Sequence, residues 1–138
     1  MKIISVLGQK GGISKSVISR ALAVEAAKAK GARVALVDLD HKQKTATNWA
    51  AARRLNDLQP EIRVVGSVDD VGDATTVIID TPGWTDAGTV QIASLSDLVV
   101  LPTGASEDDR RPVVELAFGL EDAGIPLDRI VIVPSRMH

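Results

Sequence analysis

The fold is decided by an apolar segment that leads into a glycine-containing loop, Ile3-Ile4-Ser5-Val6-Leu7-Gly8-Gln9-Lys10-Gly11-Gly12-Ile13-Ser14-Lys15-Ser16. Its first five residues are mostly apolar and β-branched, which is typical of a buried strand. From Ser16 onwards apolar residues recur at three- or four-residue spacing, as in an amphipathic helix, until Gly31 offers a C-terminal cap. The stretch therefore predicts a strand, a loop and a helix in direct succession.

The same alternation continues through the chain. We expect further strands at 33–37, 62–65, 76–79, 98–101 and 130–133, and helices at 45–56, 87–94 and 111–123. Trp49 and Leu55 should point into the core, and Pro102 should end its strand. Continuous apolar strands that alternate with helices indicate an α/β fold, with a mostly parallel sheet and helices on both faces.

Polar and charged residues follow several of these strands. In an open parallel sheet, ligands bind beyond the carboxyl ends of the strands. There the sequence places the loop from Lys10 to Ser16, the carboxylates Asp38, Asp40 and Asp80, and Ser135-Arg136. An isolated aspartate at a strand end is more often structural, but three of them beside a glycine loop favour a site for a phosphate and a divalent cation.

Composition limits the alternatives. The chain has 138 residues, enough for one domain, and it contains no cysteine, which excludes disulfides, thiolate metal sites and cysteine nucleophiles. Aromatic residues make up 2%, too few for a surface that stacks on nucleic-acid bases. No apolar run approaches the length of a membrane span, so we expect a soluble, cytoplasmic protein.

Charge is unevenly distributed along the chain. Residues 1–68 carry an excess of Lys and Arg, and residues 69–138 carry an excess of Asp and Glu. A short basic stretch is formed by Lys42, Lys44, Arg53 and Arg54. Such a stretch can contact DNA phosphates, although a solvated helix face is the commoner explanation.

The loop departs from the general phosphate-binding pattern GxxxxGK[ST], in which backbone N–H groups surround the phosphates and the hydroxyl binds magnesium. Gln9 and Ser14 occupy the two glycine positions of that pattern. The run Lys10-Gly11-Gly12-Ile13-Ser14-Lys15-Ser16 nevertheless resembles the deviant Walker A loop of the ParA/MinD family of ATPases, in which the first position is often not glycine.

Other segments are similar to the same family over essentially the whole chain. The Val37–Asp40 segment looks like the family's second strand, and Val77–Pro82 looks like its Walker B strand. The plasmid-partition members in particular resemble this sequence at Gln43 and Asn48-Trp49, and further on at Pro102, Ser106 and Asp109. The resemblance implies a P-loop NTPase with a three-layer α/β/α architecture. Residues 1–138 are then a single ParA-like nucleotide-binding domain, without the C-terminal helices that family members normally carry.

The resemblance also implies roles for individual residues. Lys15 would bind the β- and γ-phosphates of ATP, Ser16 and Asp80 would hold Mg²⁺, and Asp40 would orient the attacking water. Lys10 would be the signature lysine that reaches the partner's nucleotide across a homodimer formed in the ATP state. The remaining loop contacts to the nucleotide would come from Gly11, Gly12, Ile13, Ser14 and Val17.

The cellular role that follows from the resemblance is plasmid or chromosome segregation. Such a protein would dimerise on ATP, bind non-specific DNA at the nucleoid and respond to a centromere-binding partner protein, without a membrane. Adenine recognition and DNA binding depend most on the helices that this sequence lacks.

Three positions depart from the family pattern. Ser14 stands where the family has glycine, and we expect it to cost roughly 1–3 kcal/mol of strain. Val17 replaces a threonine and removes a hydroxyl contact, and His41 replaces a proline beside Asp40. An alternative function is therefore a degenerate module without ATPase activity that acts by binding a partner. Synthetases that use the same loop on small carboxylates, such as cobyrinic acid amide synthases, are a third possibility.

Overall fold

A computed structural model of the chain describes residues 1–8, 13–39, 45–81, 86–104 and 106–134. Within these ranges six strands form one sheet in the order β3-β2-β4-β1-β5-β6, and all neighbouring pairs are parallel. The strands are β1 (Lys2–Val6), β2 (Val34–Asp38), β3 (Arg63–Val65), β4 (Thr76–Asp80), β5 (Leu98–Thr103) and β6 (Ile130–Pro134). The predicted parallel α/β sheet is confirmed.

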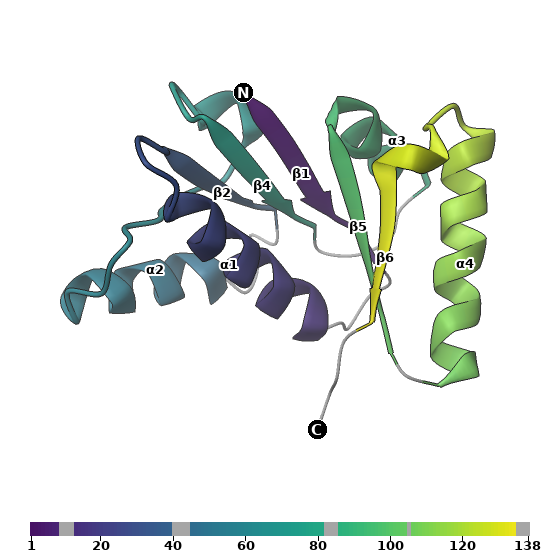
Figure 1. The fold of residues 1–138 in the computed structure, drawn as a ribbon, viewed down its shortest axis with the longest axis horizontal. Helices are drawn as coiled ribbons and strands as arrows, with labels where there is room; N and C mark the ends of the chain where they lie inside the picture. Colours follow the sequence, from purple (N-terminus) through teal and green to yellow (C-terminus); the bar gives the residue numbers. More distant parts are fainter. Residues whose placement is uncertain (9–12, 40–44, 82–85, 105, 135–138) are drawn as a thin grey trace.

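Helices cover both faces of this sheet, as Figure 1 shows. They are α1 (Ile13–Ala27), α2 (Thr45–Leu55), α3 (Asp86–Leu95) and α4 (Glu107–Asp122), with short 3-10 turns η1 (Val68–Asp70) and η2 (Leu127–Arg129). Side chains of α1 and α2 pack with Leu36, Ile78 and Val100 on one face. Side chains of α3 and α4 pack with Val99 and Leu101 on the other. The chain is therefore a three-layer α/β/α structure.

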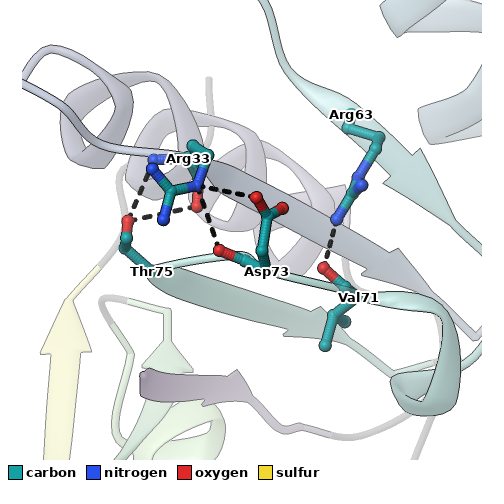
Figure 2. A network of polar contacts seen from close by, with 5 residues as sticks. All are labelled: Arg33, Arg63, Val71, Asp73 and Thr75. Atoms are coloured by element: carbon teal, nitrogen blue, oxygen red, sulfur yellow. Dashed lines mark hydrogen bonds and ion pairs between the residues drawn. The ribbon is translucent and has the colours of Figure 1, made fainter.

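Figure 2 shows the polar contacts that join loops at the amino ends of β2 and β4. The backbone N–H of Arg33 donates to the Thr75 hydroxyl oxygen over 2.9 Å. The Arg33 Nε donates to the Asp73 carbonyl over 3.1 Å and lies 3.2 Å from its carboxylate. Nearby, the guanidinium of Arg63 donates to the carbonyl of Val71. These contacts hold together the amino ends of the strands, at the opposite end of the sheet from the expected ligand site.

The first helix differs from its predicted bounds at both ends. It begins at Ile13 rather than at Ser16, because the residues that disfavour a helix, Gly11 and Gly12, precede it. It ends at Ala27, where the N–H groups of Lys28 and Ala29 bond to carbonyls three residues back. Gly31 does have the expected positive φ of 76°, but in the turn after the helix rather than as its immediate cap.

The prediction that Leu55 points inward is wrong. Trp49 packs against the core, Ala50 is buried, and Leu55 is 87% exposed. Trp49, Ala50 and Arg53 share one side of α2 because residues three and four apart are neighbours on a helix, and Leu55 lies on the opposite side.

Two further boundaries differ from the prediction by two residues or more, the end of β5 and the start of α4. The strand β5 continues through Pro102 to Thr103. The backbone N–H of Leu7 donates to the carbonyl of Val100, so residue 100 presents its polar groups to β1. Because a strand alternates every two residues, Pro102 also turns its backbone polar groups toward the β1 side, but beyond the end of β1. Its missing N–H therefore costs no hydrogen bond between strands.

The last helix begins at Glu107 rather than at Arg111. Ser106 caps it, since its side chain accepts from the backbone N–H of Asp109 over 3.1 Å. The Asp109 carboxylate in turn accepts from the backbone N–H of Ser106, which completes a capping box. This cap starts the helix well before Pro112, which it then contains.

Candidate functional site

Two buried carboxylates lie at the carboxyl ends of neighbouring strands. Asp38 ends β2 and Asp80 ends β4, and the two residues are direct partners in the parallel register. They are 6% and 5% exposed. Val6, the last residue of β1, pairs with Asp80 from the other side. The predicted convergence of Asp38 and Asp80 at this edge is therefore confirmed, while Asp40 lies outside the described residues.

Three hydrogen bonds fix the positions at which the chain leaves β1, β2 and β4. The hydroxyl group of Thr81 is buried and donates to the carbonyl of Val6 over 3.0 Å. The backbone N–H of Leu7 donates to the carbonyl of Val100 over 3.0 Å, and that of Leu39 donates to the carbonyl of Asp80 over 3.0 Å. These three bonds tie the ends of β1, β2, β4 and β5 together where the loop begins.

The helix α1 follows this loop and crosses back over the centre of the sheet (Figure 1). Its N-terminus therefore lies at the same edge as the carboxyl ends of the strands. The first turn contains no acidic residue that would neutralise the positive end of the helix dipole. Unpaired N–H groups at such a helix start are suited to an anion.

The predicted nucleotide-binding residues are only partly described. Ile13, Ser14, Lys15 and Ser16 form the first turn of α1, with their side chains outside the described part of the chain. Val17 follows on α1 and is 55% exposed. The residues Lys10, Gly11 and Gly12 also lie outside the described ranges, as do Ser135 and Arg136.

The backbone conformation bears on the strain expected at Ser14. Because Ser14 lies within α1, its backbone is in the right-handed helical region, which any L-residue adopts without glycine. The strain that the sequence suggested is therefore not seen in the backbone at this position.

Sequence reasoning missed several polar residues that fix the strands behind the site. The Ser96 hydroxyl oxygen lies 2.9 Å from that of Ser5 and 2.7 Å from the carbonyl of Ile92, all in the interior between α3 and β1. The backbone N–H of Ile3 donates to the carboxylate of Asp97 over 2.8 Å. Single serines and aspartates in these positions carry no spacing that would have identified them.

One residue of the basic stretch, Arg53 on α2, makes contacts within the fold. The guanidinium groups of Arg20 and Arg53 lie 5.7 and 5.3 Å from the ring centroid of Trp49, within cation–π range. Arg53 also donates to the carbonyl of Pro60 over 2.9 Å. Arg53 is thus a structural contact between α2 and its following turn.

Two kinds of feature are absent from the described ranges. No helix in them combines the length and apolar character that crossing a bilayer requires. Nor do three or more His, Cys, Asp or Glu side chains of those ranges gather into a group that could hold a metal ion.

Residues 4–131 match the family model described as the CobQ/CobB/MinD/ParA nucleotide binding domain, CbiA. The chain belongs to this family. Membership confirms the ParA/MinD resemblance, and it gives the chain a nucleotide as its class of ligand. No curated protein matches the chain.

Solved structures share the fold of this CobQ/CobB/MinD/ParA domain. A plasmid partition protein from Borrelia burgdorferi superposes with a TM-score of 0.73 at 16% identity, over 99% of this chain and 79% of its own. A ParA family ATPase from Chlorobium tepidum superposes with a TM-score of 0.67 at 17% identity, over 98% of this chain and 74% of its own. The MinD cell division protein of Aquifex aeolicus superposes with a TM-score of 0.71 at 15% identity, over 100% of this chain and 70% of its own. At these identities the likeness shows the fold alone.

Proposed function

We propose that this chain is a ParA-like ATPase that binds ATP with Mg²⁺, hydrolyses it slowly and acts in plasmid or chromosome segregation. One observation carries the proposal: α1 begins directly after a lysine- and glycine-containing loop, beside the paired buried carboxylates of Asp38 and Asp80. A helix start that attracts anions, next to carboxylates that attract a divalent cation, is suited to a metal-bound nucleotide. Residues 1–138 act as one nucleotide-binding domain in this account.

Phosphate binding is assigned to the loop and to the first turn of α1. Backbone N–H groups of Gly11, Gly12, Ile13 and Ser14 would donate to phosphate oxygens, and Lys15 would neutralise their charge. Val17 contributes only its backbone, since its side chain has no hydroxyl group. Support comes from the helix start at Ile13 and from the absence of acidic residues in the first turn of α1.

Metal binding is assigned to Ser16 and Asp80. Mg²⁺ prefers oxygen ligands and is usually held by one or two protein groups together with substrate phosphates. Asp80 fits this requirement, because its carboxylate is held at the end of β4 in the interior rather than in bulk water. When bound, the ion neutralises charge on the phosphates that are being cleaved.

Hydrolysis is assigned to Asp40 and Lys10. Asp40 would orient the attacking water, and Lys10 would supply a positive charge to the phosphates bound by a partner subunit, as an arginine finger does. ATP-dependent homodimerisation and hydrolysis are coupled in this proposal, because the site of each subunit is incomplete without the other.

The cellular role is proposed from the relatives. Two of the similar structures are described as a plasmid partition protein and a ParA family ATPase. By analogy, the ATP-bound dimer would bind non-specific DNA at the nucleoid in the cytoplasm, and a centromere-binding partner protein would stimulate turnover.

A second candidate function is a degenerate module that lacks ATPase activity and acts by binding a partner. Serine at position 14 and the exposed Val17 in place of a threonine favour this alternative. The two candidates differ in whether phosphate is released from ATP.

The test is a measurement of phosphate release from ATP with and without Mg²⁺. The proposal predicts slow turnover that requires Mg²⁺ and is lost in Lys15→Ala. The matched control is Lys30→Ala, which removes an exposed lysine after the end of α1. Turnover that persists in Lys15→Ala would overturn the assignment, and nucleotide binding without turnover in the unmodified chain would favour the degenerate module.

A further inference from the structure

The helices α1 and α2 are joined by one tryptophan and two arginines. The guanidinium groups of Arg20, on α1, and Arg53, on α2, both lie over the ring of Trp49, which is also on α2. We call these three residues the tryptophan contact. The two helices cover the same face of the sheet (Figure 1), so the contact links neighbouring elements of one layer.

Trp49 also contacts the interior. Its half-buried side chain packs against the hydrophobic cluster that contains Ala23 of α1 and Leu36 of β2, both fully buried. A large ring that is fixed on the core in this way has few positions open to it, because protein interiors are closely packed. Trp49 therefore sets the position of α2 relative to both the sheet and α1.

The two arginines differ in their other contacts. Arg53 is held a second time by the Pro60 carbonyl, whereas Arg20 has no hydrogen bond or ion pair with another described residue. The Nε of Arg20 is buried and lacks a hydrogen-bond partner in the part of the chain that the structure describes. A buried donor without a partner costs free energy, so packing alone does not account for an arginine at position 20. Its one electrostatic contact in that part of the chain is with the face of Trp49.

The tryptophan contact lies about one helical turn beyond the starts of two functional segments. Arg20 comes four residues after Ser16, the proposed metal ligand in the first turn of α1. Trp49 comes four residues after Thr45, the first residue of α2. At 1.5 Å per residue, each separation is about 6 Å along the helix axis. The contact thus ties the phosphate-binding end of α1 to the beginning of α2.

The beginning of α2 matters because the chain reaches it directly from Asp40. On the other side of Asp40, the backbone N–H of Leu39 donates to the carbonyl of Asp80 over 3.0 Å. Residues 40–44 connect Leu39 to Thr45, and a chain spans at most about 3.5 Å per residue. The position of α2 therefore restricts where Asp40 can lie relative to the end of β4.

We propose that Trp49 is a positioning residue for ATP hydrolysis. Through Arg20 it fixes α2 against the helix whose first turn is assigned to phosphate binding, and it thereby restricts the segment that carries Asp40. This inference rests on the proposed function. Because Trp49 and Arg20 lie outside the residues assigned to phosphate and metal binding, loss of their contact should slow the attack of water without weakening the binding of ATP.

The test compares the dissociation constant for ATP, from calorimetry, with kcat, from phosphate release, both in the presence of Mg²⁺. Trp49→Leu keeps an apolar side chain but removes the ring. We expect its kcat to fall by about tenfold or more, with the dissociation constant within about threefold of the unmodified chain. Trp49→Phe keeps an aromatic face for the cation and should recover most of the turnover.

Arg20 variants test the same contact from α1. Arg20→Met keeps the length of the side chain without its charge and should slow turnover as Trp49→Leu does, whereas Arg20→Lys keeps the charge and should turn over ATP normally. The double variant Arg20→Met/Trp49→Leu should be no slower than Trp49→Leu, because both changes remove one contact. Arg20→Met decides the question if Trp49→Leu does not fold.

Arg54→Met is the matched control, because Arg54 is exposed on α2 outside the tryptophan contact and should leave both values unchanged. Normal turnover in Arg20→Met and Trp49→Leu would overturn this inference alone. A parallel loss of affinity and kcat, or additive losses in the double variant, would also overturn it, because a merely structural role produces them. Absence of turnover in the unmodified chain would instead overturn the proposed function, and this inference with it.

Discussion

The Thr81 hydroxyl group donates a buried hydrogen bond to the Val6 carbonyl, with Oγ1 and O 3.0 Å apart. Val6 is the last residue of β1, before the proposed nucleotide-binding loop, and Thr81 directly follows Asp80. One side chain thus joins the strand that starts the phosphate loop to the strand that holds the proposed metal ligand. The contact adds to the β1–β4 pairing, which places Val6 directly opposite Asp80.

Replacing Thr81 by valine keeps the shape of the side chain and removes the hydroxyl group. We expect Thr81→Val to lower the free energy of unfolding by about 1–2 kcal/mol, because a buried carbonyl loses a partner. Urea unfolding measures the change, and Thr81→Ser, which keeps the hydroxyl group, is the control. Equal stability of the valine variant and the unmodified chain would mean that the bond contributes nothing.

Asp80→Asn should remove the effect of Mg²⁺ on nucleotide affinity. The amide keeps the size of the carboxylate but lacks its charge, so we expect the gain in affinity on adding Mg²⁺ to fall by about tenfold or more, with Mg²⁺-free binding retained. Calorimetric titrations with and without the ion measure both values. Asp70→Asn, on the exposed turn η1, should behave as the unmodified chain, and an intact Mg²⁺ effect in Asp80→Asn would assign the ion to other ligands.

Ser14→Gly should leave nucleotide affinity within about tenfold of the unmodified chain. The helical backbone at Ser14 does not need glycine, so restoring the family residue relieves little strain. Parallel titrations and phosphate-release assays of the two proteins test this. ATPase activity that arises only in the glycine variant would support the degenerate module instead.

Ser106→Ala should destabilise the chain without affecting nucleotide binding. Ser106 and Asp109 form the capping box of α4, and loss of such a cap costs about 1 kcal/mol. Thermal unfolding measures the loss, with Ser106→Asp as the variant that keeps a capping oxygen. A clear fall in nucleotide affinity in Ser106→Ala would show that these residues do more than begin a helix.

Much of the fold was predictable because it depends on periodicity. Residues 34–37 and 77–79 of the strands around Val37 and Ile78 are apolar and are buried on both faces, as the sequence indicates. The approach of Asp38 to Asp80 was also predictable, since parallel strands bring their carboxyl ends to one edge. These features follow from the chain's local pattern and a general rule of sheet topology.

Other features depend on contacts between distant residues. Leu55 has the apolar character of a core residue, but Trp49, which is far larger, determines which side of α2 turns inward. Proline usually ends a strand, but the backbone of Pro102 lies past the end of β1, where its missing N–H costs no hydrogen bond between strands. Thr81 reaches a carbonyl 75 residues away, and no spacing in the sequence signals that bond.

The central claim is that the loop before α1 binds ATP. Isothermal titration calorimetry with ATP and Mg²⁺ tests it most directly, on the unmodified chain, Lys15→Ala and the surface control Lys30→Ala. The account predicts Mg²⁺-dependent binding that Lys15→Ala destroys and Lys30→Ala leaves intact. Absence of binding to the unmodified chain at millimolar ATP, or equal binding by all three proteins, would contradict it.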